Sequence, residues 1–150
     1  MNDAFYNPNE CIGFMTYTAN RFLGAALHKH MTEMGVDLTS EQWGLLIQFW
    51  NRGDIAQEEI ARTAGVDKST ASRCLGVMER RGLVVRRVDP VDTRRKILSL
   101  TDEANALKQN CLQAVQAALA HALKDIDPEE CATCLKVLGL VKKNLQGLEK

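Results

Sequence analysis

Apolar residues recur at three- and four-residue intervals over most of the chain, which is the spacing of amphipathic helices. The first such stretch covers about residues 10–34 and stops at Gly35, since glycine often follows the last turn of a helix. It is roughly twice as long as an average globular helix, which favours packing against something outside its own domain. Residues 40–51 form the next stretch, where Thr39 and Gln42 make the T-x-x-Q pattern of a capping box.

Two shorter helices are predicted in the middle of the chain. They cover residues 55–63 and 68–81, and the aspartates that precede them, Asp54 and Asp67, can cap them. A glycine-bearing turn at 64–66 separates the two helices. Helix, tight turn and helix is the arrangement that lets a second helix project into a DNA major groove about 12 Å wide.

The remaining elements are a β-hairpin and two further helices. Strands are predicted at 83–88 and 96–100 from their β-branched content and alternation, with a turn of Asp and Pro at 89–93. Helices follow at 102–123 and 129–148. The last one carries an a/d heptad stripe made of Cys131, Cys134, Leu138, Val141, Leu145 and Leu148. The predicted fold is therefore mainly α with a small β-hairpin (α+β).

Charge changes this picture from a generic helical protein to a candidate DNA-binding protein. The formal net charge of the 150 residues is zero. Residues 68–96, however, hold nine basic side chains against three acidic ones, so the rest of the chain is correspondingly acidic. A basic island on an acidic body suits a face that binds phosphates.

The helix predicted at 68–81 has two distinct faces when its residues are placed at about 100° steps. Its inward face is apolar and comprises Ala71, Cys74, Leu75 and Met78. Its outward face is small, hydroxylated and cationic, and the N-terminal end of such a helix normally enters the groove. The DNA contacts expected from this helix are Lys68, Ser69, Thr70, Ser72 and Arg73. The alternative is an ordinary solvated helix face, which the following hairpin argues against.

The hairpin adds cations at its tip. Arg94 and Arg95 lie next to Asp92 on a loop too short to bury them, and a cationic arm on a rigid ribbon suits the minor groove. Arg86 and Arg87 are interpreted either as contacts to the DNA backbone or as solvated strand residues.

These motifs together resemble the signature of the MarR family of bacterial transcription regulators. The similar stretch is IARTAGVDKSTASRCLGVMERRGLVVRRVDPVDTRRKILSLT, and the resemblance covers about residues 10–148. The chain departs from the family pattern at two places. Ala71 stands where the family usually has valine, and the family commonly has a glycine near the position of Ala104. The matching motifs are S-T-x-S-R (Ser69, Thr70, Ser72, Arg73), E-x-x-G-L-V (Glu79, Gly82, Leu83, Val84), D-x-R (Asp92, Arg94), L-T (Leu100, Thr101), L-T-x-x-Q-W (Leu38, Thr39, Gln42, Trp43) and I-G-F (Ile12, Gly13, Phe14).

The resemblance implies one winged helix-turn-helix domain over residues 1–150. Its DNA-reading lobe would cover about 38–101, and N- and C-terminal dimerisation helices would cover about 10–34 and 102–148. It also implies that Arg94 reads the minor groove and that Asp92 helps to hold it.

A two-fold dimer presents its two recognition helices roughly 34 Å apart. The expected partners are therefore a second copy of the chain and double-stranded DNA with a pseudo-palindromic operator. We expect a transcriptional repressor, released by a small-molecule effector or another signal, with no cofactor. No residue specifies the effector.

The five cysteines offer alternative functions. Cys11 is predicted in the first turn of a helix, where the helix dipole lowers a thiol pKa, so a redox-sensing regulator is one alternative. Cys131-x-x-Cys134 is a single pair, whereas structural zinc sites use four ligands. Both of its thiols lie on the heptad stripe, so we expect them to be packed and predict no metal site.

Other protein classes are less consistent with the sequence. A winged-helix module for protein–protein contacts without DNA binding would have a diluted basic wing, and no constellation of residues indicates an enzyme. The opening MNDAFYNPNE is polar and acidic, unlike a signal peptide, and no apolar run approaches the roughly 18 residues of a membrane span. The expected location is the reducing cytoplasm, away from the membrane.

Overall fold

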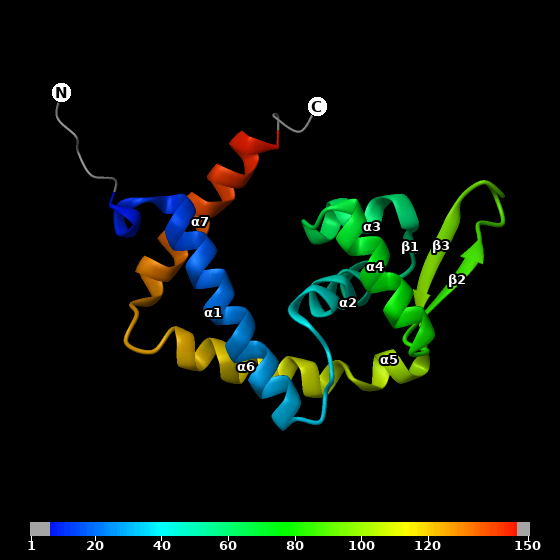
Figure 1. Cartoon of the computed structure of the whole chain (residues 1–150), viewed down its shortest axis with the longest axis horizontal. Helices are drawn as coiled ribbons and strands as arrows, with labels where there is room; N and C mark the ends of the chain where they lie inside the picture. The colour runs from blue at the N-terminus through cyan, green and yellow to red at the C-terminus, as the bar shows by residue number, and fades with distance from the viewer. Residues whose placement is uncertain (1–6, 147–150) are drawn as a thin grey trace. The chain divides into compact units, whose positions relative to one another are not determined.

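The computed structural model describes residues 7–146, which fall into two compact units, one up to Ala118 and one from Leu119 onward. Part of the opening MNDAFYNPNE and position 148 of the heptad stripe lie outside the described residues. The single-domain organisation stays a prediction. The elements in chain order are η1 (Pro8–Glu10), α1 (Ile12–Glu33), α2 (Ser40–Arg52), β1 (Ile55–Ala56), α3 (Gln57–Ala64), α4 (Lys68–Arg80), β2 (Val84–Val88), β3 (Lys96–Leu100), α5 (Asp102–Ala106), α6 (Lys108–Ala122) and α7 (Pro128–Leu145) (Figure 1).

The long first helix is confirmed as α1. The Thr16 hydroxyl donates to the carbonyl of Ile12 at 2.7 Å, so this polar side chain finds its hydrogen-bond partner within the helix. Beyond the helix, Gly35 takes a left-handed conformation with φ 71°, which favours a residue without a Cβ. Met31 is the buried side chain of this helix, so most of its apolar residues are left uncovered.

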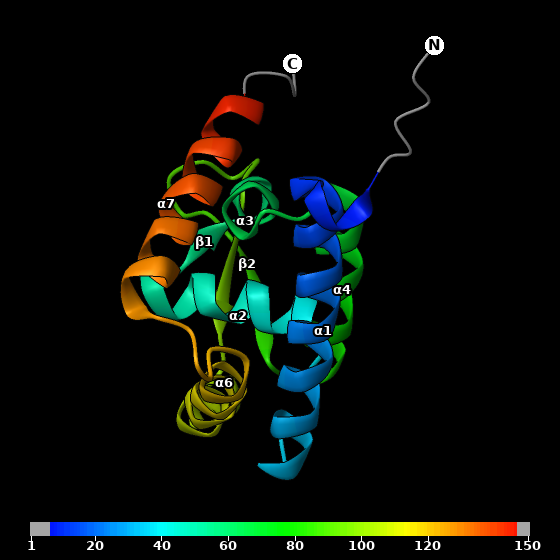
Figure 2. The same ribbon diagram turned by 90° about the vertical axis from the view of Figure 1, so that its left-hand side faces the viewer.

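The three helices α2, α3 and α4 pack around one core in the first unit. Their fully buried side chains include Leu46 of α2, Ile60 of α3 and Met78 of α4. The capping box before α2 is confirmed, because Gln42 N donates to Thr39 Oγ1 and Thr39 N donates to the Gln42 side chain. The quarter turn from Figure 1 to Figure 2 shows α3 above α2 and α4 beside them.

The β structure has three antiparallel strands in the order β1-β3-β2, one more than the predicted hairpin. The helix predicted at 55–63 with Asp54 as its cap is wrong at its start. Ile55 lies opposite Leu98 and Ala56 opposite Ile97, so these two residues extend the sheet. The helix α3 begins only at Gln57 and has no side-chain cap. Burial of Ile55 and Ala56 against β3 outweighs the local helical pattern.

The helix predicted at 102–123 is interrupted at Leu107, where α5 ends and α6 has not begun. The Leu107 N–H bonds to the carbonyl of Ala104, only three residues back, so the turn is locally tightened. Thr101 caps α5 by accepting from Ala104 N, and its hydroxyl also donates to Gly82 O at 2.6 Å. His121 is exposed in the last turn of α6.

The second unit contains α7. Asp127 caps it by accepting from Glu129 N at 2.7 Å, and Pro128 occupies its first position, where its missing N–H costs nothing. Along the heptad stripe Cys131 is half-buried, but Cys134 is exposed, so the expectation that both thiols are packed is wrong for Cys134 in a single chain. No helix among residues 7–146 combines the length and hydropathy needed to cross a membrane.

Candidate nucleic-acid interface

The helix α4 presents the two faces that its sequence predicts. Ala71, Cys74, Leu75 and Met78 are the buried residues of α4, and they fix the helix on the core of the first unit. Lys68, Ser69, Ser72 and Arg73 are exposed on the other face. The outward face therefore offers hydroxyls and positive charges, which can bind phosphates or base edges.

Thr70 differs from the other residues of this predicted contact set. Its backbone N–H donates to Asp67 Oδ1 at 2.8 Å and its hydroxyl donates to Asp67 Oδ2 at 2.6 Å. Both hydrogen bonds hold the pKa of Asp67 below its usual value, and the one from the hydroxyl has the larger effect. A hydroxyl hydrogen that is already donated cannot also be given to a phosphate oxygen, so in this conformation Thr70 supports the N-cap that Asp67 makes for α4.

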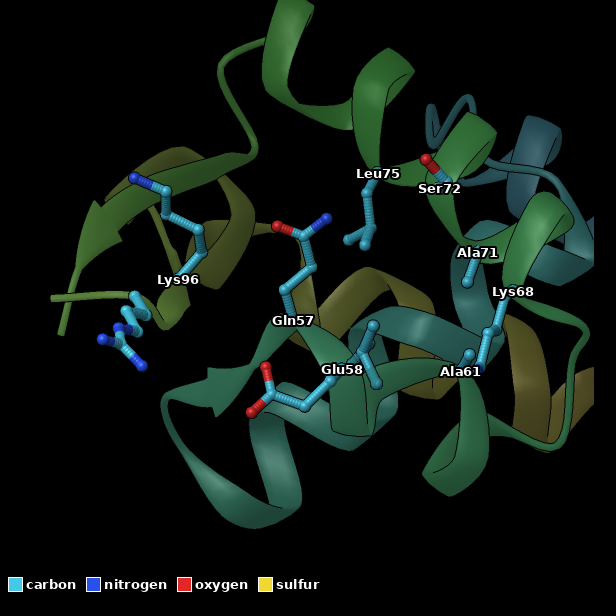
Figure 3. Close-up of a pocket in the computed structure, with 10 residues that line it drawn as sticks. Gln57, Glu58, Ala61, Lys68, Ala71, Ser72, Leu75 and Lys96 are labelled. Carbon is cyan, nitrogen blue, oxygen red and sulfur yellow. The ribbon is translucent and has the colours of Figure 1, made fainter. Parts of the chain in front are cut away.

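A cavity of about 430 Å³ lies between α3, α4 and the wing, which is the hairpin of β2 and β3 (Figure 3). Figure 3 shows Lys68 and Ser72 of α4 on one side, Lys96 of β3 on the other, and Gln57 and Glu58 of α3 between them. Arg94 also lines this cavity. Basic side chains from the recognition helix and from the wing thus meet around one concave surface.

The wing tip is organised by two aspartates. Asp92 Oδ1 accepts from the backbone N–H of Arg94 at 3.0 Å, and Asp89 Oδ1 accepts from Val91 N at 2.8 Å. The bonds that Asp89 accepts from Val91 N and then Asp92 N lower its pKa. Sequence reasoning singled out Asp92 but not Asp89 as a support of the wing. The Asp-Pro turn pattern was the available signal, since aspartate often bonds the backbone two residues on.

Several arginines of the basic island are held by carboxylates. Arg95 Nε donates to Glu58 Oε1 at 2.8 Å. The pKa of Glu58 lies below its usual value, first because of a backbone hydrogen bond of Glu58 and then because of this bond from Arg95. The remaining pairs are Arg86 with Glu79 at 2.8 Å, Arg87 with Asp54, and Arg81 with Asp37 at 3.5 Å. Arg86 and Arg87, interpreted above as DNA-backbone contacts or solvated strand residues, are thus both ion-paired within the lobe.

The other basic residues of the island form no ion pair with the residues that the structure describes. They are Lys68, Arg73, Arg80, Arg94 and Lys96. All are exposed, and they lie on α4 or at the wing. Of the nine cations in residues 68–96, these five are therefore the ones whose charge no carboxylate of the described residues neutralises by an ion pair.

The cysteines are distributed among different environments. Cys11 is half-buried and lies at the N-cap of α1 rather than in its first turn as predicted. Burial raises the pKa of the Cys111 thiol to about 11, and it also raises the pKa of Cys74. Among residues 7–146 no group of three or more His, Cys, Asp or Glu side chains could hold a metal ion.

Comparison with known proteins supports a regulator. The model of the MarR family matches residues 36–95, which contain α2 to α4 and most of the wing. The uncharacterized HTH-type transcriptional regulator YdgJ of Bacillus subtilis is 24% identical over 105 residues. That match covers 70% of this chain and 64% of the relative, so less than two thirds of the relative's length is matched.

Two solved structures show how far the fold is shared. A mutant of MarR from E. coli, complexed with operator DNA, superposes with a TM-score of 0.81 at 24% identity over 91% of this chain and 97% of that one. BpsR of Bordetella bronchiseptica, whose DNA binding is regulated by 6-hydroxynicotinic acid, has a TM-score of 0.82 at 18% identity, covering 91% and 96% of the two chains. At these identities the likeness establishes the fold.

Proposed function

We propose that this chain, which belongs to the MarR family of winged helix-turn-helix transcriptional regulators and not to a family of enzymes, is a homodimeric, sequence-specific repressor. The observation that carries the proposal is the set of exposed cations on α4 and at the wing. Arg86, Arg87 and Arg95 of the wing are ion-paired with carboxylates. The unpaired cations of the island still lie on the outer face of α4 and at the wing, the two elements expected to contact DNA.

The proposed contacts follow from which side chains are available. Ser69, Ser72 and Arg73 read bases or phosphates in the major groove, and arginine can bond guanine through two acceptors at once. Lys68 binds phosphate and Arg94 enters the minor groove. Because Thr70 and Arg95 are engaged by Asp67 and Glu58, their contribution is to position the helix and the wing.

Homodimerisation is supported by apolar side chains that the single chain leaves uncovered. In α1, Tyr17 and Phe22 are 68% and 65% exposed, and in α7 Leu135 is 66% exposed. Large exposed apolar side chains of this kind mark interaction surfaces, and a two-fold dimer is the commonest way in which identical chains cover them. Two recognition helices then face two halves of a pseudo-palindromic operator.

Release by a small molecule is the proposed signal, by analogy with BpsR, whose DNA binding responds to 6-hydroxynicotinic acid. The redox alternative rests on Cys11, which is half-buried at a helix N-cap. Peroxide treatment that leaves DNA affinity unchanged would eliminate that alternative. The protein–protein module without DNA binding is disfavoured by the intact set of unpaired wing and helix cations.

The test begins with selection of bound fragments from a random duplex library, followed by fluorescence anisotropy with the selected duplex. We expect tight, salt-dependent binding by a dimer, with the random duplex bound at least about a thousandfold more weakly. Light scattering of the protein alone and of the complex reports the stoichiometry. Equal affinity for the selected and the random duplex would refute sequence-specific reading, and a monomer on a single half-site would refute the dimer.

A further inference from the structure

One wing arginine is held by an acidic residue on a different element. Arg95 and Glu58 are 37 residues apart in sequence, and Nε of the guanidinium lies 2.8 Å from Oε1 of the carboxylate. The side chains of this pair remain 43% and 57% exposed. Glu58 also lines the cavity between α3, α4 and the wing, together with Lys96 (Figure 3) and with Arg94.

An exposed ion pair of this kind contributes little to folding stability. Its position matters more, because it lies beside the surface proposed to face the DNA backbone. A guanidinium whose charge a carboxylate already neutralises attracts a phosphate less strongly, so Arg95 contributes less to the phosphate neutralisation and counterion release that drive non-specific binding. At the same time the pair ties the wing to α3 and therefore to the helix-turn-helix.

We propose that Glu58 is a specificity-determining residue, which withholds Arg95 from the phosphate backbone while it keeps the wing in register with α4. This inference rests on the proposed DNA binding. Any duplex offers phosphates to Arg95, but only the affinity for the operator depends on a fixed distance between the wing and α4. Glu58 thereby lowers the affinity for random DNA and preserves the affinity for the operator.

The experiment compares Glu58→Gln with Glu59→Gln in the full-length protein. Glutamine at 58 keeps an oxygen that can accept from Arg95 but removes the charge that competes with phosphate. Glu59 is the matched control, because it lies on the same helix, carries the same charge and pairs with Arg62 at 3.4 Å. Glu59 acts on Arg95 only by electrostatic attraction, without a hydrogen bond. Affinities for the selected operator and a random duplex are measured by anisotropy from about 50 to about 200 mM salt.

For Glu58→Gln we expect the salt slope of random-duplex binding to steepen by about 0.9 per released arginine, or about 1.8 per dimer. The ratio of random-duplex affinities at about 50 and about 200 mM salt then grows about 12-fold. The operator-to-random affinity ratio falls, Glu59→Gln leaves the slope unchanged, and Arg95→Gln abolishes the effect of Glu58→Gln in the double variant.

Three results would overturn the inference: an unchanged slope in Glu58→Gln, an equal change in Glu59→Gln, or an effect that persists without Arg95. Each of these leaves the proposed function intact, since the wild type still prefers its operator. Failure of the wild type to bind any duplex would instead overturn the proposed function and this inference together. Thermal unfolding of each variant confirms that the slopes are compared between folded proteins.

Discussion

The division between paired and unpaired arginines makes a quantitative prediction about salt dependence. Arg94 lies exposed at the wing tip and forms no ion pair among the described residues, whereas Arg87 pairs with Asp54. Replacing either one by glutamine removes one positive charge per chain. We expect only Arg94→Gln to change the salt slope, because only that guanidinium is available to a phosphate.

The magnitude follows from how many phosphates the dimer neutralises. Each neutralised phosphate adds about −0.9 to the slope of log affinity against log salt, so the slope for a dimer of Arg94→Gln is shallower by about 1.8. Its affinity then falls about 12-fold less than that of the wild type between about 50 and about 200 mM salt. The wild-type slope itself is bounded in the same way. Four of the nine cations in the island are ion-paired, so five per chain remain. The salt slope of the wild-type dimer is then limited to about −9, whereas all nine cations per chain would give about −16.

The assay is anisotropy with a labelled operator over a series of salt concentrations, with the protein folded at each. Arg87→Gln serves as the matched control, since it lies on the same ribbon and makes the same formal change of charge. An equal change of slope in the two variants, or a wild-type slope much steeper than about −9, would refute the assignment of paired and unpaired cations.

Three further predictions address base reading, the core and the thiols. Arg73→Ala is expected to weaken operator binding by about 1–3 kcal/mol and to relax preference at one base pair; an unchanged preference profile against base-substituted operators would contradict this. Met78→Ala truncates a side chain that is 0% exposed, so urea unfolding should show a free energy of unfolding lower by about 2–5 kcal/mol with the m value unchanged. A free energy of unfolding equal to that of the wild type would contradict this and show that the site repacks. Because burial raises the pKa of Cys111 to about 11, this thiol stays protonated at neutral pH, and mass spectrometry should find alkylation of the exposed Cys134 well before Cys111; equal labelling rates in the folded protein would contradict it.

Much of the fold could be predicted from the sequence because its signals are local. The capping box of Thr39 and Gln42 and the N-cap Asp67 act within a few residues, so the starts of α2 and α4 were recognisable. The inward face of α4 followed from helical period alone, since Leu75 and Met78 can reach the core only together. The family resemblance, confirmed over residues 36–95, rests on these same short motifs.

What the tertiary structure decided involves residues far apart in the chain. Ile55 joins a sheet with Leu98, although its local pattern is helical, because cross-strand pairing and burial are set by a distant segment. The candidate site was predicted as a set of cations, and the sequence could not distinguish among them. Arg95 is distinguished from Arg94 by a carboxylate 37 residues away, and no local pattern encodes that partner. Sequence alone thus determined that this face is basic, and only the packing of the wing on α3 and α4 decided which of its charges are available to bind DNA.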